Sequence, residues 1–417
     1  MLSKNVKRFF CETISPFLHR AAQEQPTLYL LSSCAVAVAG FAYLIIFPSL
    51  FMVSIGKLYT LYPETISSGM HFSHYLWLSL FLISTLVSFR IFSFRFPKIE
   101  GVRVKPEKLP TLFTVLDTLQ QETGNPTIQR VIVTDKYELE LIKSPIFGIP
   151  FWSHNILVIG LPFLQSLSSA HFRCALTRKL LQFNKRGNLL SNWLYQMRQI
   201  WQHYLRQLQR DCRFGEQALL WFFMLYTPLF RSITVSAAQL DELVADRKVL
   251  DMINNDDVFK TIESIIISKI FLSKQYWPKV RGMFKQDPNA NIYPYAKLER
   301  IIKSAFMRND LKQWLEKNYE MESGPLDTTP TLKARMDVLG RKDVKPPSSP
   351  NETAAMVYLE NAYSEVVKRI DEKWLKKQRQ RKGEALDNET SADNFFASER
   401  NTPVQQKVYL EADSVMR

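Results

Sequence analysis

The sequence predicts a mainly α-helical protein with a small β-sheet, an α+β fold, behind an N-terminal transmembrane hairpin of two helices. Two apolar stretches, residues 28–55 and 71–92, are each long enough to cross a bilayer, which takes about 20 residues. Short β-branched runs at 129–133 and 155–159 are typical of strands. Most other segments repeat their apolar residues at helical spacing, which favours helices around the sheet.

The composition bears on the partners of the protein. The chain has 417 residues, enough for more than one domain, and a formal net charge of +14. Such a basic chain could bind nucleic acid, but its sequence has no helix-turn-helix, zinc-finger or RNA-binding signature. Positive charge beside membrane segments explains the excess, so we expect the lipid bilayer as a partner and no nucleic acid. The four cysteines lack paired spacing and are expected to be free thiols.

Changes of composition divide the chain into five segments. A basic cytoplasmic segment, 1–27, precedes the hairpin at 28–94. The soluble domain is expected at 95–343, and a Pro/Ser linker with an amphipathic C-terminal helix at 344–382. The last segment, 383–417, is polar and without periodicity, so it is predicted to be disordered.

The charges beside the two apolar stretches predict the orientation of the hairpin. Lys and Arg are frequent in 1–27 and again in 90–108, whereas the loop expected at 57–71 holds a single Lys. The positive-inside rule therefore places both ends of the hairpin, and the soluble domain, in the cytoplasm. The expected protein is an integral membrane protein with two spans, in the inner or plasma membrane if it is bacterial. Pro48 is expected to kink or end the first helix.

Further elements are expected downstream. Helical spacing predicts helices at 112–122, 188–214 and 354–375, and Pro and Gly residues predict an irregular segment at 143–153. A third apolar stretch, 218–238, allows two interpretations. It is long enough for a further span, but we favour a buried or membrane-surface helix, because a proline and an arginine interrupt it.

Three segments share the order and spacing of a known family. The first reads GLPFL at 160–164 and ALTRKLLQF at 175–183, the second ELVAD at 242–246, and the third DTTPTLKARMDVLG at 327–340. Together they resemble the membrane zinc metallopeptidases of the HtpX and CAAX prenyl protease type. The resemblance covers roughly residues 128–375 and implies a zincin-like metallopeptidase fold, with a small sheet beside the active-site helix.

The catalytic motif of that family is degenerate here. In the family, two His at i and i+4 on one helical face bind zinc, and a Glu between them is the general base. The matching positions hold Arg178, Lys179 and Gln182. A guanidinium has no free lone pair for a metal, and a charged ammonium cannot accept a proton from water. Thr329 stands where the family has a further His.

The other half of the family's site is retained. The resemblance makes Glu242 a relic metal ligand and Asp246 the carboxylate behind it. We therefore predict a catalytically inactive, membrane-anchored pseudopeptidase that binds a protein or an extended peptide and needs no cofactor. The alternative is an active zinc-dependent membrane endopeptidase whose metal is bound by ligands not recognised in the sequence. It would need at least two of the six His near Glu242.

Without a metal ion, another positive group must compensate the negative charges of Glu242 and Asp246. Glu242 and Asp246 lie one helical turn apart on one face, which in the family meets the face of the two His. We expect Arg178 to form an ion pair with Glu242 or Asp246, and Gln182 to donate its amide to the second acid. Lys179 is expected to face solvent or the substrate cleft. The alternative is that Arg178 turns to water and the cleft stays open.

Two weaker constellations lie near the membrane segments. His71 and His74, three residues apart, allow a metal site or an ordinary helix end, and we favour the helix end. Ser54 and Lys57 have the spacing of a Ser/Lys dyad, but they lie at the end of a membrane helix, which makes catalysis there a remote alternative.

The predicted orientation can be tested with reporter fusions. A reporter joined after residue 64 is expected to read as outside, and one joined after residue 110 as inside, because the basic flanks stay in the cytoplasm. Activity of a paired cytoplasmic and external reporter at each site measures this. The reverse pattern would place the soluble domain outside the cell.

Overall fold

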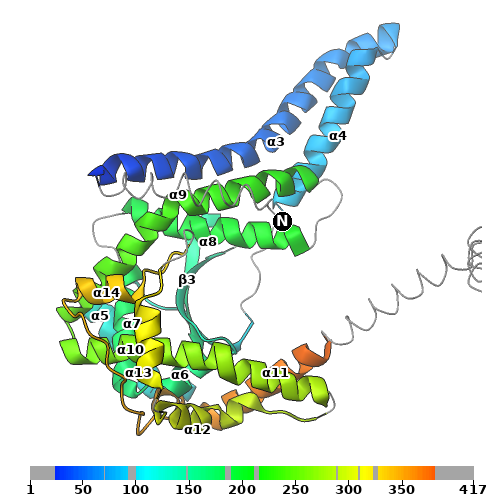
Figure 1. Ribbon diagram of the computed structural model, residues 1–417. Coiled ribbons are helices and arrows are strands. Elements are labelled where there is room, and N and C mark those ends of the chain that lie inside the picture. Colours follow the sequence, from blue (N-terminus) through cyan, green and yellow to red (C-terminus); the bar gives the residue numbers. More distant parts are fainter. Residues whose placement is uncertain are drawn as a thin grey trace, which may run out of the picture.

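The computed structural model describes residues 24–69, 71–92, 100–146, 149–183, 189–210, 216–287, 290–308, 310–322 and 327–380. The segment predicted to be disordered, 383–417, and almost all of the basic segment 1–27 lie outside them. Within them the protein is mainly helical with one small sheet, as the sequence predicts. Figure 1 shows a helical body from which two long helices extend.

The sheet has four strands in the order β1-β2-β4-β3. They are β1 Val102–Val104, β2 Arg130–Thr134, β3 Leu139–Ile146 and β4 Ile149–Gly160. β2 and β4 are parallel, and the other two pairs are antiparallel. β1 and β3 are therefore the edge strands, and β4, which leads into the following helices, is an inner strand.

The structure overturns the irregular segment expected at 143–153. β3 and β4 cover all of it except residues 147 and 148, which lie outside the described chain, and the ladder pairs Lys143 with Asn155 and Pro145 with Ser153. Pro145 is tolerated because β3 is an edge strand, where one N–H of every two points away from the ladder. Register shifts between Pro145 and Ile146, so the proline coincides with an irregularity in the strand.

Helices surround one face of the sheet and form the main core. They are α5 Pro110–Thr123, α6 Leu161–Ser166, α7 Ser169–Phe183, α10 Asn255–Phe271, a π-helical turn Leu272–Tyr276, α11 Trp277–Gln286, α12 Pro294–Phe306, α13 Leu311–Tyr319 and α14 Leu332–Val338. The single continuous helix predicted at 354–375 is wrong. α15 Ala354–Leu359 is followed by a 3-10 turn, Glu360–Ala362, in which Glu360 has a φ of 43°, and residues 363–380 form a second helix. Both pieces pack in the same core as the sheet.

The first apolar stretch forms a helix longer than expected. α3 runs over Pro26–Ser68, so the loop predicted at 57–71 is helical for most of its length. α3 bends along its length (Figure 1) and contains Pro48 and Pro63, which lack the N–H of a regular helical bond. α4 Phe72–Phe92 packs beside it, with the rings of Phe51 and Phe81 stacked 5.5 Å apart.

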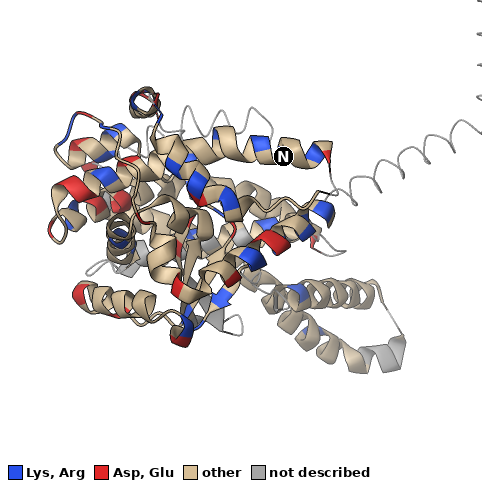
Figure 2. Cartoon of the chain, turned by 90° about the horizontal axis from the view of Figure 1, so that it is seen from below, with Lys and Arg blue, Asp and Glu red and all other residues tan. Residues whose placement is uncertain are grey.

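Three helices of the described chain are long and apolar enough to cross a membrane: α3, α4 and α9 Gln217–Leu250. Figure 2 shows the α3–α4 pair almost free of charged residues beside a body that carries many. α9 contains the stretch for which two interpretations were left, and Trp221 and Leu225 on it are 70% and 58% exposed. An apolar surface of this kind is as expected of a membrane protein.

α3 is joined to α9 and to α8 Leu189–Arg210 in a second apolar core. Hydroxyl groups link α3 and α9: Tyr43 Oη donates to the carbonyl of Ala218 at 3.1 Å, and Tyr226 Oη donates to that of Val36 at 2.7 Å. Gly40 makes this approach possible, because a Cβ there would lie 2.7 Å from Tyr226 Oη. The ring of Tyr226 stacks between aromatic neighbours and has little room to move.

We expect Gly40→Ala to destabilise the contact of α3 with α9 by about 1–3 kcal/mol, because the added methyl overpacks a filled site. Gly56→Ala, in the same helix, is the matched control. A Cβ at Gly56 would meet nothing within 4 Å, so that variant should be neutral or slightly more stable. Denaturant unfolding in detergent micelles, followed by tryptophan fluorescence, measures both. Equal losses in the two variants would contradict the close approach.

Candidate functional site

The junction between β4 and α6 positions α7. β4 ends at Gly160, where a Cβ would lie 1.9 Å from the carbonyl oxygen of Lys136 and 2.9 Å from the nitrogen of Glu138. Only glycine allows the chain to pass so close to this backbone. After α6, the hydroxyl of Ser168 accepts a hydrogen bond from the N–H of His171 at 3.2 Å and so caps α7. α7 therefore leaves the sheet in a defined direction.

α9 forms the opposite wall and presents two acids to α7. Glu242 and Asp246 are one turn apart on α9, and both contact Arg178 of α7. Arg178 Nη2 donates to Glu242 Oε2, and Arg178 Nε donates to Asp246 Oδ1. Gln182 Nε2 donates to the remaining oxygen of Glu242, Oε1, at 2.6 Å. The four side chains thus tie two helices that are about 60 residues apart in sequence.

Arg335 completes the cluster. Its Nε donates to Asp246 Oδ2 at 2.7 Å and its Nη2 to Asp246 Oδ1 at 2.9 Å, from α14. Asp246 is fully buried and bonds to two guanidinium groups. In the sequence Arg335 belongs to the segment 327–340, and nothing in that segment predicts a contact with Asp246. A buried carboxylate needs a hydrogen-bond donor for each of its oxygens. One arginine cannot supply donors for both carboxylates, and this was the only signal in the sequence for a second cation.

Burial and charge act in opposite directions on Arg178. Its side chain is 17% exposed, and burial by itself lowers the pKa of the guanidinium. The charges of Glu242 and Asp246 outweigh this and raise the pKa of Arg178, so the side chain stays protonated. Burial raises the pKa of Cys174, one turn earlier on α7, to about 11. That thiol is therefore not an activated nucleophile.

A cleft of about 220 Å³ lies next to this ion cluster. The residues that line it come from β3, α7, α8, α9 and the segment before α14: Glu140, Lys179, Gln182, Arg198, Gln202, Arg231, Ala238, Asp241, Glu242, Thr328 and Thr329. Lys179 Nζ donates to Gln182 Oε1 at 3.0 Å. Gln239 of α9 donates to the carbonyl of Asp327 at 2.7 Å, which holds the segment carrying Thr329 against the cleft.

The structure thus brings together the residues that the sequence analysis selected from three segments. Arg178, Glu242 and Asp246 form the ion cluster, and Lys179, Gln182 and Thr329 line the adjoining cleft.

The donor set of this site does not fit a zinc ion. Arg178 and Lys179 offer only N–H donors, and Gln182 already uses its amide oxygen for Lys179 and its amide nitrogen for Glu242. Within the described part of the chain no group of three or more His, Cys, Asp or Glu is arranged to hold a metal. His19 and the side chain of His203 lie outside that part.

The two weaker constellations have local structural roles. The ring of His74 accepts a hydrogen bond at Nδ1 from the N–H of His71 (3.1 Å), and its Nε2 lies 3.3 Å from the carbonyl of Leu61. Both ring nitrogens of His74 are therefore engaged with backbone. Ser54 Oγ donates to the carbonyl of Leu50 at 2.6 Å, one turn earlier, instead of pairing with Lys57.

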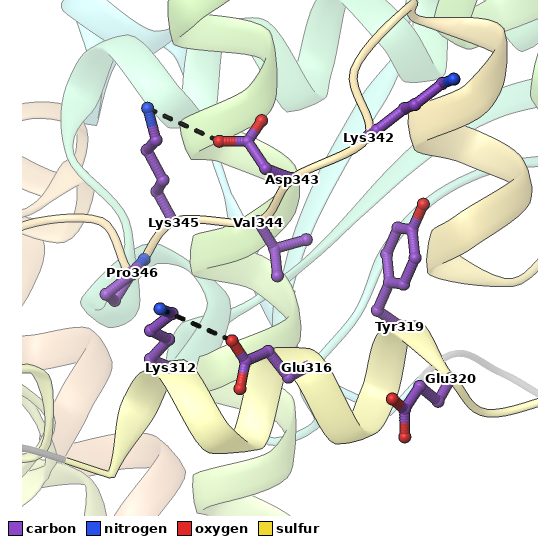
Figure 3. A pocket seen from close by; sticks show the side chains of 9 residues that line it. All are labelled: Lys312, Glu316, Tyr319, Glu320, Lys342, Asp343, Val344, Lys345 and Pro346. Carbon is purple, nitrogen blue, oxygen red and sulfur yellow. Dashed lines mark ion pairs between the residues drawn. The ribbon is translucent and has the colours of Figure 1, made fainter.

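A larger depression, of about 470 Å³, lies between α13 and the segment after α14 (Figure 3). Its lining holds three Lys and three acids, Lys312, Lys342, Lys345, Glu316, Glu320 and Asp343, so their charges balance. Four of the six form pairs, Lys345 with Asp343 at 3.5 Å and Lys312 with Glu316 at 3.7 Å. Such exposed pairs stabilise little and leave no unbalanced charge for a ligand. The cleft beside the ion cluster is therefore the better candidate site.

Comparison of the chain with protein-family models, with curated proteins and with solved structures finds no match.

We expect Arg178→Ala to destabilise the soluble domain by about 3–5 kcal/mol, because it removes the ion pair of Glu242 and one of the two ion pairs of Asp246. Arg173→Ala is the matched control on the same helix. Arg173 is half exposed and lies 3.9 Å from Glu122, so its loss should cost about 0–1 kcal/mol. Denaturant titration of both variants and the parent measures the difference. Equal stability of Arg178→Ala and the parent would show that the cluster does not hold the helices together.

Proposed function

We propose that this protein is a membrane-anchored, catalytically inactive metallopeptidase-like protein, with a zincin-like fold, that binds an extended peptide segment of a protein partner. The observation that carries the proposal is the position of Arg178. Its guanidinium binds Glu242 and Asp246 at the crossing of α7 and α9, where the resembled family holds its zinc. On this proposal the site keeps the framework of the resembled family and has lost its zinc chemistry.

The loss of hydrolysis follows from the side chains. Peptide hydrolysis in such a site needs a Lewis acid to polarise the carbonyl and activate water, and a base to accept the proton. Arg178 supplies positive charge but cannot coordinate water through a lone pair, and Lys179 stands where the base belongs. Cys174 is buried and protonated and supplies no substitute nucleophile.

The edge of the sheet supports peptide binding. β3 is an edge strand, and no further strand pairs with it among the described residues. Gly160 donates to the carbonyl of Glu138, so hydrogen-bonded pairs recur at every second residue of β3. The N–H and C=O of Leu139 and Leu141 therefore point away from β4. Glu140, between them, lines the cleft, so a peptide paired with β3 would lie along it.

The membrane segments support an anchored site. We propose two spans, α3 and α4, with both ends in the cytoplasm and the cleft on the cytoplasmic side. The apolar surface of α3 and α4 and the basic residues beside them support this arrangement. α9 passes from the apolar core with α3 and α8 to Glu242 and Asp246, so the cleft lies close to the anchoring helices.

We expect protein purified without added metal to contain no stoichiometric zinc and to cleave neither casein nor peptides. Metal analysis by mass spectrometry and a cleavage assay with and without chelator measure this. Stoichiometric zinc with chelator-sensitive cleavage would establish the alternative, an active endopeptidase. The triple variant Arg178→His, Lys179→Glu, Gln182→His is expected to gain zinc, because it restores the helical ligands and the base. Failure of that variant would indicate further change at Thr329.

If a peptide pairs with β3 as a strand, methylation of every second backbone amide of the peptide should weaken its binding. A ten-residue peptide selected on the purified protein should lose about tenfold in affinity when two amides that pair with β3 are methylated, because each bond contributes about 0.5–1.5 kcal/mol. Methylation of the alternate amides, which point away from β3, is the matched control and should have little effect. Fluorescence anisotropy measures both. Equal effects would exclude pairing with β3, and absence of any binding peptide would refute the proposed function.

A further inference from the structure

The charges around the ion cluster are not balanced. Glu242 and Asp246 supply two negative charges, while Arg178, Lys179 and Arg335 supply three positive ones. Every carboxylate oxygen of the two acids already accepts a hydrogen bond from Arg178, Gln182 or Arg335. The extra cation is therefore Lys179, which makes no ion pair within the described chain.

Gln182 holds Lys179 in a defined place. The amide nitrogen of Gln182 donates to Glu242 and its amide oxygen accepts from Lys179 Nζ at 3.0 Å. This orientation of the amide is unambiguous, because a carboxylate only accepts and an ammonium only donates. Gln182 therefore connects the ion cluster to Lys179 and directs the ammonium without neutralising it.

The ammonium of Lys179 lies at the cleft. It has three N–H donors, of which the bond to Gln182 uses one, and Lys179 lines the cleft beside Gln182 and Thr329. Two donors and a full positive charge are left for a group that enters. Arg198 and Arg231 line the same cleft, and the Arg198 side chain donates to Thr234 Oγ1 and to the carbonyl of Thr234, both at 3.1 Å.

The acids of the cleft define where an anion would fit. Glu140 lies on β3, beside the path of a paired peptide, and Asp241 lies on α9. A carboxylate next to either would be repelled. Glu242 is paired with Arg178 and bonded by Gln182, and the charge of Lys179 acts on Glu242 without forming an ion pair between the two in the described chain. A favourable position for a negative group is over α7, at Lys179.

We propose that the cleft selects extended peptides that place a carboxylate on Lys179, so that the residue standing at the family's general-base position serves as the recognition cation. This inference rests on the proposed function, which supplies the peptide and its pairing with β3. The carboxylate belongs to an Asp or Glu side chain or to the C-terminus of the peptide. Both sources present the same planar pair of acceptor oxygens to the ammonium.

Two pairs of labelled ten-residue peptide pools test the proposal on the full-length protein in detergent. The first pair has blocked ends and either Glu or Gln at one position, scanned along the peptide, with neutral residues elsewhere. The second pair has no acidic side chain and either a free or an amidated C-terminus. We expect at least one acid-bearing pool to bind about tenfold more tightly than its neutral counterpart. The pair that responds identifies the source of the carboxylate.

Variants of Lys179 connect the preference to this residue. Lys179→Gln should lose the tenfold preference while still binding the neutral pools, and Lys179→Arg should keep it. Lys297→Gln, an equal change of charge at an exposed position of α12, is the matched control and should leave the preference unchanged. Thermal unfolding of each variant verifies that it is folded. An acid preference that persists in Lys179→Gln overturns the inference.

The failure of the inference and that of the proposed function are distinguishable. If neutral and acidic pools bind the parent protein equally, the cleft binds peptides without selecting a carboxylate, and only the inference fails. If no pool binds, the proposed function fails and the inference with it. A preference that falls as salt is raised and disappears in Lys179→Gln supports the proposal.

Discussion

The contact of Arg178 with the two carboxylates of α9 is the interaction on which the arrangement of the site depends. α7 comes from the sheet and α9 from the apolar core with α3 and α8, and the ion cluster joins them. Buried acids would force the helices apart or take up protons if no cation compensated them. Arg335 extends the same constraint to α14 and to the segment that carries Thr329. One cluster therefore determines how three parts of the chain enclose the cleft.

A guanidinium and a metal ion can both compensate the negative charge of buried carboxylates, but they leave different chemistry at the site. Both neutralise acids on a neighbouring helix, but a metal keeps an open coordination position, whereas a guanidinium directs its N–H groups in one plane and uses them on the acids. Arg178 donates hydrogen bonds to Glu242 and Asp246 and has no lone pair that could bind a metal ion. The arrangement favours a rigid helix crossing, and the neighbouring Lys179, bonded to Gln182, is a cation that lines the cleft.

α9 connects the site to the membrane segments. Its first half packs on α3 and α8, with hydroxyl bonds from Tyr43 and Tyr226, and its second half carries Glu242 and Asp246. α9 therefore reaches from the apolar core with α3 and α8 to the cleft, and Pro228 inside it removes one backbone N–H and permits some bending.

The sequence by itself determined the helical class, the strands near 129–133 and 155–159, and which residues share a helical face. The spacing of Arg178 and Gln182, and of Glu242 and Asp246, follows from the period of the α-helix alone. Tertiary structure decided the rest. Pro145 suggested a loop, but pairing of β3 with β4 outweighed it because an edge strand tolerates a missing N–H. Arg335 meets Asp246 across 89 positions of sequence. No local pattern encodes such a contact, because it depends on how distant helices pack around a shared buried charge.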